Sequence, residues 1–329
     1  MARSRALILF RLAAALLLWG AAAGADNAFA ASCCGGGSAS SLTLSKFASS
    51  MIDVSLDVEK YDGYWDSEGK YKSDPPGSRL SQYRLNLGYA RRLSPNWQVS
   101  AALPFVWNDN RYSAVSSSTK GIGDAAFGFW YEAFDEMRCV WKVESIEDMK
   151  PAIYAGATIT APTGISPYDG VSTSFDVTGR GFWRVDANLL LDKTVYPWNA
   201  TLMYSYGVYM ERPVNREYGN YVQPYHKKLG DRRLVSLSGG YTYFMHNMSS
   251  LTGTLALSEL SEAGGTIDGA ADPTTGMRKR SVAGTIAWAS DDRDWVTKFT
   301  ISHTIKQDGY GANFPATDVF TLGVSHVLR

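Results

Sequence analysis

The chain has few cysteines, no excess of charge of either sign, and no long apolar run beyond its first 30 residues. Three cysteines among 329 residues cannot form a disulfide framework that would hold a fold together. Lysine plus arginine equals aspartate plus glutamate, at 32 each, so there is no electrostatic basis for binding nucleic acid. No later segment is long and apolar enough to cross a membrane as a helix. These absences leave an all-β protein, soluble or embedded, as the class that the plentiful tyrosine, tryptophan and glycine favour.

Recognisable catalytic and cofactor motifs are also missing. The sequence has no C-x-x-C-H haem attachment and no Cys/His set with zinc spacing, and the glycine run after Cys34 lacks the strand and lysine of a phosphate-binding loop. Some outer-membrane barrels are phospholipases with His and Ser two residues apart. That spacing occurs at none of the four histidines, His226, His246, His303 and His326. We therefore predict no enzymatic activity, no catalytic residues, no metal and no cofactor.

The first 30 residues are typical of an export signal. Arg3 and Arg5 form a positive n-region, an apolar h-region follows, and residues 28–30 form an A-x-A cleavage site. Arg11 interrupts the apolar run, which argues against a membrane-anchoring helix. The sequence therefore predicts a signal peptide over residues 1–30.

Two adjacent cysteines, Cys33 and Cys34, lie just after the predicted cleavage site, in a segment (31–50) that we expect to be flexible and periplasmic. Three interpretations stay open: a start with no role, a contact to a redox partner or thiophilic metal, and a lipid acceptor at Cys33. The predicted topology puts Cys139 on the same side of the membrane. A disulfide from one of the pair to Cys139 is easier to build than one between neighbours, which strains the peptide link.

Residues 97–107 (WQVSAALPFVW) show the alternation of a membrane-spanning strand. One parity is wholly apolar with Trp at both ends, and the other is smaller and partly polar. Ten steps of about 3.4 Å, tilted by about 45°, climb roughly 24 Å, which matches the apolar band of about 25 Å on an outer-membrane barrel. Aromatic residues at both ends of so long a strand favour the membrane over a soluble sandwich.

The same alternation recurs through residues 51–329 and predicts about twelve strands, an even number as single-chain bacterial barrels require. The connections after odd-numbered strands are long and rich in Gly, Pro, Asp and Tyr, whereas those after even-numbered strands are mostly tight turns such as LSPN and HNMS. One even connection, which contains Cys139, is long. We therefore predict a transmembrane antiparallel up-and-down β-barrel over 51–329, with long loops outside the cell and both chain ends in the periplasm.

Charged and amide residues occupy the parity opposite the apolar one in several strands. A barrel lumen tolerates such residues cheaply, whereas the core of a sandwich does not. Two interpretations stay open: a mixed-charge constriction that selects solutes, and a lumen closed by its own side chains. The predicted lumen-lining residues are Asp53, Asp57, Glu59, Arg84, Asn86, Arg184, Asp186 and Arg233.

Three short glycine-rich motifs resemble a known family. GIGDAAFGFW (121–130), APTG (161–164) and TGRGFW (178–183) are similar to motifs of the outer-membrane transporter family associated with the meta-pathway of phenol degradation. The resemblance covers the chain from about residue 51 onward. It implies a small porin-like barrel that passes small organic molecules, often aromatic, and it implies no catalytic residues. The CCGGG start and the final Leu328-Arg329, in place of a terminal aromatic residue, depart from that family's pattern.

Together these features predict a protein of the Gram-negative outer membrane that passes small solutes, hydrophobic or aromatic ones among them, by passive diffusion through its lumen. Its expected partners are outer-membrane lipid and the small-molecule solute, with no nucleic acid. The alternative is a structural scaffold, in which the barrel anchors or sheathes a periplasmic redox partner such as a cytochrome through its cysteine-bearing face.

Overall fold

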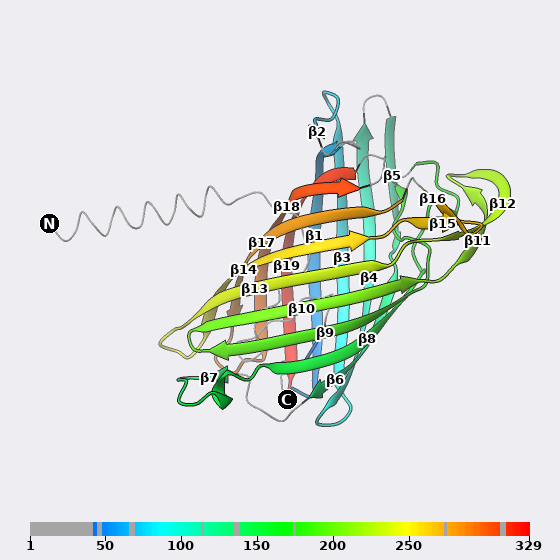
Figure 1. Cartoon of the computed structure of the whole chain (residues 1–329). Helices are drawn as coiled ribbons and strands as arrows, with labels where there is room; N and C mark the ends of the chain where they lie inside the picture. Colours follow the sequence, from blue (N-terminus) through cyan, green and yellow to red (C-terminus); the bar gives the residue numbers. More distant parts are fainter. Residues whose placement is uncertain are drawn as a thin grey trace.

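Twelve long strands form one antiparallel β-barrel (Figure 1) in the computed structural model, which describes residues 42–44, 48–65, 70–112, 115–133, 139–173, 176–272, 275–309 and 314–329. The main sheet contains 15 strands, of which three, β2, β5 and β7, are short additions to the twelve. The barrel strands are β1 (Ser50–Trp65), β3 (Arg79–Arg92), β4 (Trp97–Tyr112), β6 (Ala125–Ala133), β8 (Ala152–Ala161), β9 (Arg184–Val195), β10 (Trp198–Tyr209), β13 (Arg232–Phe244), β14 (Ser250–Glu262), β17 (Met277–Ala289), β18 (Trp295–Gly309) and β19 (Phe314–Leu328).

Each barrel strand pairs with its neighbour in sequence, and the first strand pairs with the last. β1 runs antiparallel to β19 from Ser50↔Leu328 to Trp65↔Phe314, and β9 pairs with β10 along its whole length. No barrel strand therefore has a free edge, which satisfies the backbone hydrogen bonds that lipid cannot. The predicted all-β, up-and-down antiparallel barrel of about twelve strands is confirmed.

Sequence alternation determines which way each side chain points. In β4, Trp97, Leu103 and Phe105 are exposed on the outside, whereas Gln98 and Val106 are buried on the inside. The outer face carries a continuous apolar surface, to which nearly every strand contributes exposed Leu, Val, Ile, Phe, Tyr or Trp side chains. In the part of the chain that the structure describes, no helix is long and apolar enough to cross a membrane.

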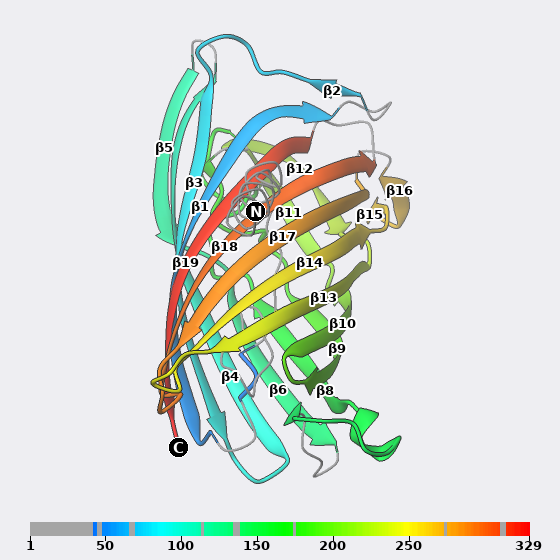
Figure 2. The ribbon, with the colours of Figure 1, turned by 90° about the vertical axis from the view of Figure 1, so that its left-hand side faces the viewer.

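The shorter elements extend the two ends of the barrel. At the end where the strand connections are long, β5 (Val115–Ile122) lengthens the hairpin with β4, β2 (Tyr71–Lys72) pairs with β1, and a second sheet forms from β11 (Arg212–Glu217), β12 (Asn220–Lys228), β15 (Gly265–Ile267) and β16 (Ala270–Asp272). At the other end lie the paired residues Ser50 and Leu328 and the short turns, together with β7 (Cys139–Val140) and the 3-10 helix η1 (Glu147–Met149). The C-terminus marks this end of the barrel in Figure 2, and β7 is labelled there in Figure 1. We name these the extracellular and periplasmic ends, following the rule for outer-membrane barrels.

One connection differs from the expected pattern. The connection after the eleventh strand is short, because β18 ends at Gly309 and β19 begins at Phe314. The two strands therefore include residues that the sequence suggested were loop, and they pair with each other from Trp295↔His326 to His303↔Asp318. The long periplasmic connection after β6 is present as predicted, and its β7 pairs in parallel with the end of β9.

The loop lengths predict which turns reach the cell surface. A biotin-acceptor tag inserted after Gly269, between β15 and β16, is expected to be labelled on intact cells by an impermeant reagent. The same tag after Ser94, in the turn between β3 and β4, is expected to be labelled only after the outer membrane is permeabilised. Labelling of the Ser94 tag on intact cells would invert the orientation.

Candidate transport lumen

The lumen has two dissimilar walls. The inner faces of β13, β14, β17 and β18 carry small side chains through the middle of the barrel, while the opposite strands carry charged, amide and aromatic side chains. Small residues also lie opposite one another on neighbouring strands. Ser238 pairs with Ala256, and Ala256 pairs with Ala283. The members of the small-residue wall are Ser236, Ser238, Thr254, Ala256, Ser281, Ala283, Thr285 and Ser302.

The structure brings five of the predicted lumen residues together on β1 and β3. Asp57 accepts hydrogen bonds from Asn86 Nδ2 and from Thr321 Oγ1, both at 2.7 Å. Arg84 lies 4.0 Å from the Glu59 carboxylate. These contacts join neighbouring strands, so these charges pair along one wall of the lumen.

Asp53, the fifth of this group, is completely buried. Its Oδ1 accepts a hydrogen bond from Lys298 Nζ at 2.9 Å and another from Ser325 Oγ. The Lys298 chain lies flat across Gly323, where an added Cβ would come within 2.5 Å of Lys298 Cε. The ion pair therefore spans the seam at which the first and last strands close the barrel.

Two further predicted residues, Arg184 and Asp186, form a cluster near the extracellular end of β9. Arg184 Nε lies 2.8 Å from Asp186 Oδ2, and Arg232 Nη1 lies 3.9 Å from Asp186 Oδ1. Arg184 also donates a hydrogen bond to the Tyr209 hydroxyl, at 3.3 Å. The cluster is inside the barrel, where two arginines share one buried carboxylate.

The prediction for Arg233 is wrong. Arg233 shares its parity with the exposed Val235 and Leu237 and therefore points outward, where its guanidinium lies 5.7 Å from the ring centre of Tyr206. Arg232 is the inward residue of this pair. The apolar side chains of the strand determine the parity, because exposing them to lipid is favourable, and an arginine at the rim of the membrane can reach the headgroups.

The loop between β8 and β9, residues 162–183, is tied to the junction of β5 and β6. Asp124 accepts hydrogen bonds from the backbone N–H groups of Gly164 (3.1 Å) and Arg180 (2.7 Å). Thr163 donates to the Gly123 carbonyl and Thr178 to the Ile122 carbonyl, at 2.6 and 2.7 Å. We call this set of contacts the loop anchor.

The loop anchor consists of the three glycine-rich motifs identified in the sequence. Gly164 and Gly179 are in such close contact that a Cβ on Gly164 would lie 2.8 Å from the Gly179 Cα. An added Cβ on Gly179 would lie 2.2 Å from Asp124 Oδ1. These motifs therefore share a physical cause: glycine is needed where two backbone segments and a carboxylate meet.

From the loop anchor the loop reaches across to the far strands. Arg180 Nη1 donates hydrogen bonds to both oxygens of Glu262 on β14, at 2.6 and 2.7 Å, and to the Tyr209 hydroxyl at 2.7 Å. Strands β9, β10 and β13 separate β14 from β8, at which the loop starts. The loop therefore bridges a quarter or more of the barrel circumference and narrows the extracellular opening.

Aromatic rings of the loop pack against one another and against Tyr209 of β10. Phe182, which is buried, meets Tyr168 and Tyr209 edge to face, with ring centres 5.5 and 6.3 Å apart. The Arg212 guanidinium lies 4.9 Å from the centre of the Tyr168 ring. Burial raises the pKa of the Tyr168 hydroxyl well above its ordinary value, so this ring stays neutral at every physiological pH. Of these rings only Tyr168 is partly exposed, and it lies next to the positive charge of Arg212.

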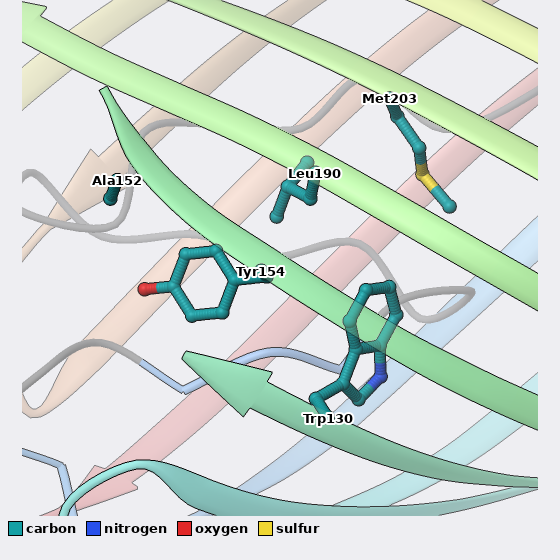
Figure 3. Packing of buried hydrophobic residues seen from close by; sticks show 5 residues of the cluster. All are labelled: Trp130, Ala152, Tyr154, Leu190 and Met203. Atoms are coloured by element: carbon teal, nitrogen blue, oxygen red, sulfur yellow. The ribbon is translucent and has the colours of Figure 1, made fainter. Parts of the chain in front are cut away.

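Bulky side chains narrow the periplasmic end. Trp130, Tyr154, Leu190, Met203 and Ala152 form a buried cluster on the inner faces of β6, β8, β9 and β10 (Figure 3). The Tyr154 hydroxyl donates to Glu132 at 3.1 Å, and Glu132 also pairs with Arg92 at 3.1 Å. This paired carboxylate is compensated in charge and in hydrogen bonding, which allows it to remain buried.

Part of the predicted flexible N-terminal segment lies inside the barrel. Leu42 and Leu44 are 2% and 1% exposed, and the Leu44 N–H donates to Gln98 Oε1 at 2.5 Å. Apolar burial and a hydrogen bond therefore hold residues 42–44 against the inner wall, in contrast to the expected flexible periplasmic segment over 31–50. Residues 1–41 and 45–47, and with them the predicted signal peptide, Cys33 and Cys34, lie outside the described residues.

The predictions for the three cysteines and for a metal remain predictions. The backbone of β7 pairs Cys139 with Thr194, which puts this cysteine at the periplasmic end, but its side chain lies outside the described residues. The disulfide therefore stays a prediction. The described ranges contain no group of three or more His, Cys, Asp or Glu that could hold a metal ion.

Sequence reasoning missed the residues that shape both narrow regions of the lumen. Asp124, Arg180 and Trp130 all lie within the quoted glycine-rich motifs, so the motifs were a usable signal for the site. Glu262 had no such signal, because its partner Arg180 is 82 residues away in the sequence.

Comparison with known proteins supports the fold. No family model and no curated protein sequence matches the chain. Among solved structures, the chain is similar to the COG4313 outer membrane channel from Pseudomonas putida F1, with a TM-score of 0.65, 16% identity, and coverage of 85% of this chain and 96% of the other. It is also similar to the β domain of the Bordetella autotransporter BrkA (TM-score 0.49, 10% identity, 84% and 99% covered) and to the Pseudomonas putida toluene transporter TodX (TM-score 0.39, 12% identity, 93% and 99% covered). The first of these likenesses assigns the chain the fold of an outer-membrane channel.

Proposed function

We propose that this protein is a channel of the bacterial outer membrane that admits small solutes, hydrophobic and aromatic ones among them, by passive diffusion through its lumen. The observation that carries the proposal is the bridge of residues 162–183, which extends from the loop anchor to Glu262 and narrows the extracellular opening. The apolar outer face and the likeness in fold to an outer-membrane channel support the location.

The proposed solute class follows from the chemistry of the opening. Tyr168 is partly exposed and offers its ring to an aromatic solute, while Phe182 and Tyr209, each 2% exposed, pack around it. Arg212 and the exposed Arg180 add positive charge beside these rings. No described residue acts as a nucleophile or acid–base pair in this path, so we propose a channel with no enzymatic step.

The alternative function, a scaffold for a periplasmic redox partner, gains no support from the described residues. It rests on Cys33, Cys34 and the Cys139 side chain, which lie outside them. The fold likeness concerns a channel.

Releasing the bridge is expected to widen the channel. Asp124→Ala removes the acceptor of two backbone N–H groups, and Gly179→Val forces the two segments of the loop anchor apart. We expect the single-channel conductance of the refolded barrel in potassium chloride to rise at least about twofold in each variant. Current carried by potassium benzoate tests the passage of a small aromatic solute directly.

Asp109→Ala is the matched control for this experiment. Asp109 pairs with Arg79 at 2.7 Å on an exposed extracellular hairpin, and its loss should leave conductance unchanged. A wild-type barrel that conducts neither chloride nor benzoate, with no gain in either loop-anchor variant, would refute the channel and favour a closed structural lumen.

A further inference from the structure

An apolar recess in the periplasmic half of the lumen is filled by the chain itself. The buried residues Leu42 and Leu44 pack there against β3 and β4, and β1 starts only after the chain has returned to the periplasmic rim at Ser49. Leu42 lies deeper in the barrel than Leu44, since Leu42 touches Gly88 while Leu44 is bonded to Gln98. The residues that form the recess are Met51, Gly88, Ala90, Ala102 and Val327.

The shape of the recess depends on small side chains. Gly88 has no Cβ, and an added one would lie 2.7 Å from Leu42 Cδ1 and 3.0 Å from Cδ2. Ala90 is completely buried, with the partly buried Ala102 packed against the same cluster. A branched hydrocarbon group thus occupies a hollow that larger wall residues would abolish.

A carboxamide with one unused group lies at the edge of the recess. Gln98 is 0% exposed; its Oε1 accepts the Leu44 N–H, while its Nε2 has no hydrogen-bond partner among the described residues. A buried polar group left unpaired is unfavourable by about 1–3 kcal/mol in general, and such groups often indicate a ligand or water. Gln98 is also the cross-strand partner of the buried Trp130.

We infer that this recess is a solute subsite, for which Leu42 and Leu44 compete with the solute. The inference rests on the proposed function and specifies its solute: a small molecule with a branched or aromatic hydrocarbon group and a hydroxyl. The hydrocarbon group takes the place of the Leu42 side chain. The hydroxyl replaces the Leu44 N–H as a donor to Gln98 Oε1 and accepts from Nε2, which has no hydrogen-bond partner among the described residues. Apolar walls with one convergent polar group are the usual composition of a small-molecule site.

The competition has a measurable consequence. Because the N-terminal segment and the solute cannot both fill the recess, the apparent Kd of the solute is its intrinsic value divided by the fraction of molecules with the recess open. Truncating both leucines in Leu42→Ala/Leu44→Ala weakens the competitor without altering the walls. We expect the apparent Kd to fall about tenfold or more.

The experiment uses 4-isopropylphenol as the probe and cumene, which lacks only the hydroxyl, as its matched comparison. Binding to the refolded full-length mature barrel in detergent is measured by isothermal titration calorimetry. Gly88→Val, which fills the recess, provides the blank for partition of the probes into the micelle. Gly253→Val is the control for Gly88→Val, because a Cβ added at Gly253 would have no atom within 4 Å and would point out of the barrel.

We expect 4-isopropylphenol to bind the wild type, to bind the double-leucine variant more tightly, and to lose binding in Gly88→Val but not in Gly253→Val. Gln98→Leu should abolish the preference for 4-isopropylphenol over cumene. Equal binding by the wild type, the double-leucine variant and Gly88→Val would overturn the subsite. If Gly88→Val does not fold, an unchanged apparent Kd in the double-leucine variant is by itself enough to overturn the subsite.

Failure of the subsite and failure of the channel are separate results. If the barrel conducts benzoate but shows none of these binding differences, the proposed function is supported and the subsite is refuted. If the barrel binds 4-isopropylphenol in the recess but conducts nothing, the recess is a binding site and the proposed channel is refuted.

Discussion

Asp53→Ala is expected to lower the free energy of unfolding of the barrel by about 3–5 kcal/mol, since it removes the carboxylate that pairs with the buried ammonium group of Lys298. Asp53 is 0% exposed and the Lys298 side chain is 8% exposed, with 2.9 Å between their charged atoms. The pair lies where β1, β18 and β19 meet, so its loss weakens the contact between the first and last strands that closes the barrel. Urea unfolding in phospholipid vesicles, followed by tryptophan fluorescence, measures the change.

Two controls isolate the cause. Glu259→Ala removes an exposed carboxylate paired with Arg278 and Arg280 at the extracellular rim, and should cost less than about 1 kcal/mol. Asp53→Leu combined with Lys298→Met removes both buried charges and should recover most of the lost stability. If Asp53→Ala cost no more than Glu259→Ala, the seam would not depend on the ion pair.

Leu103→Arg is expected to destabilise the barrel by about 2–4 kcal/mol, as charged side chains do near the membrane midplane on the lipid face of a barrel. Leu103 is 41% exposed on the outside of β4, between the aromatic residues Trp97 and Trp107 that end its apolar stretch. The arginine would put a charged group in contact with lipid, where water cannot hydrate it. The same unfolding experiment in vesicles measures the effect.

The matched control is Leu93→Arg. Leu93 is also an exposed leucine, at 58%, but it lies in the turn between β3 and β4 at the periplasmic interface. There the cost should fall to about 0–1 kcal/mol. Ser100→Arg, on the inner parity of β4, should also be milder than Leu103→Arg. Equal costs at positions 93, 100 and 103 would show that depth and parity are misassigned, or that the barrel is not in a membrane.

Much of the architecture was predictable because an outer-membrane strand has one face in lipid and one face inside. That difference produces an alternation of apolar and polar residues with a period of two. The alternation can be read in residues 97–107 without knowing which strands pair with them. The same rule shows why Arg233 was misassigned. Its charge suggested the lumen, but Val235 and Leu237 share its parity and determine which face meets lipid.

The candidate site was predictable only in part. Asp53, Asp57, Arg84, Asn86, Arg184 and Asp186 were identified from parity, since inward position is a local property of a strand. Their partners were not identified, because Lys298 reaches Asp53 across 245 residues of sequence and Arg180 reaches Glu262 across 82. Such pairings depend on closure of the barrel and on the path of a loop, and neither leaves a periodic pattern.

By itself the sequence determined the number of strands, their antiparallel order, the outward face of nearly every strand, and the assignment of long and short connections to opposite ends. These follow from the alternation between lipid and lumen and from turn composition, which act over a few residues. Only the tertiary structure decided that residues 162–183 cross the opening, that Leu42 and Leu44 fill a recess inside the lumen, and that one wall is built of small residues facing a charged one. Each of these depends on side chains from distant strands competing for the same limited interior, and that competition is settled by packing and burial once the barrel has closed.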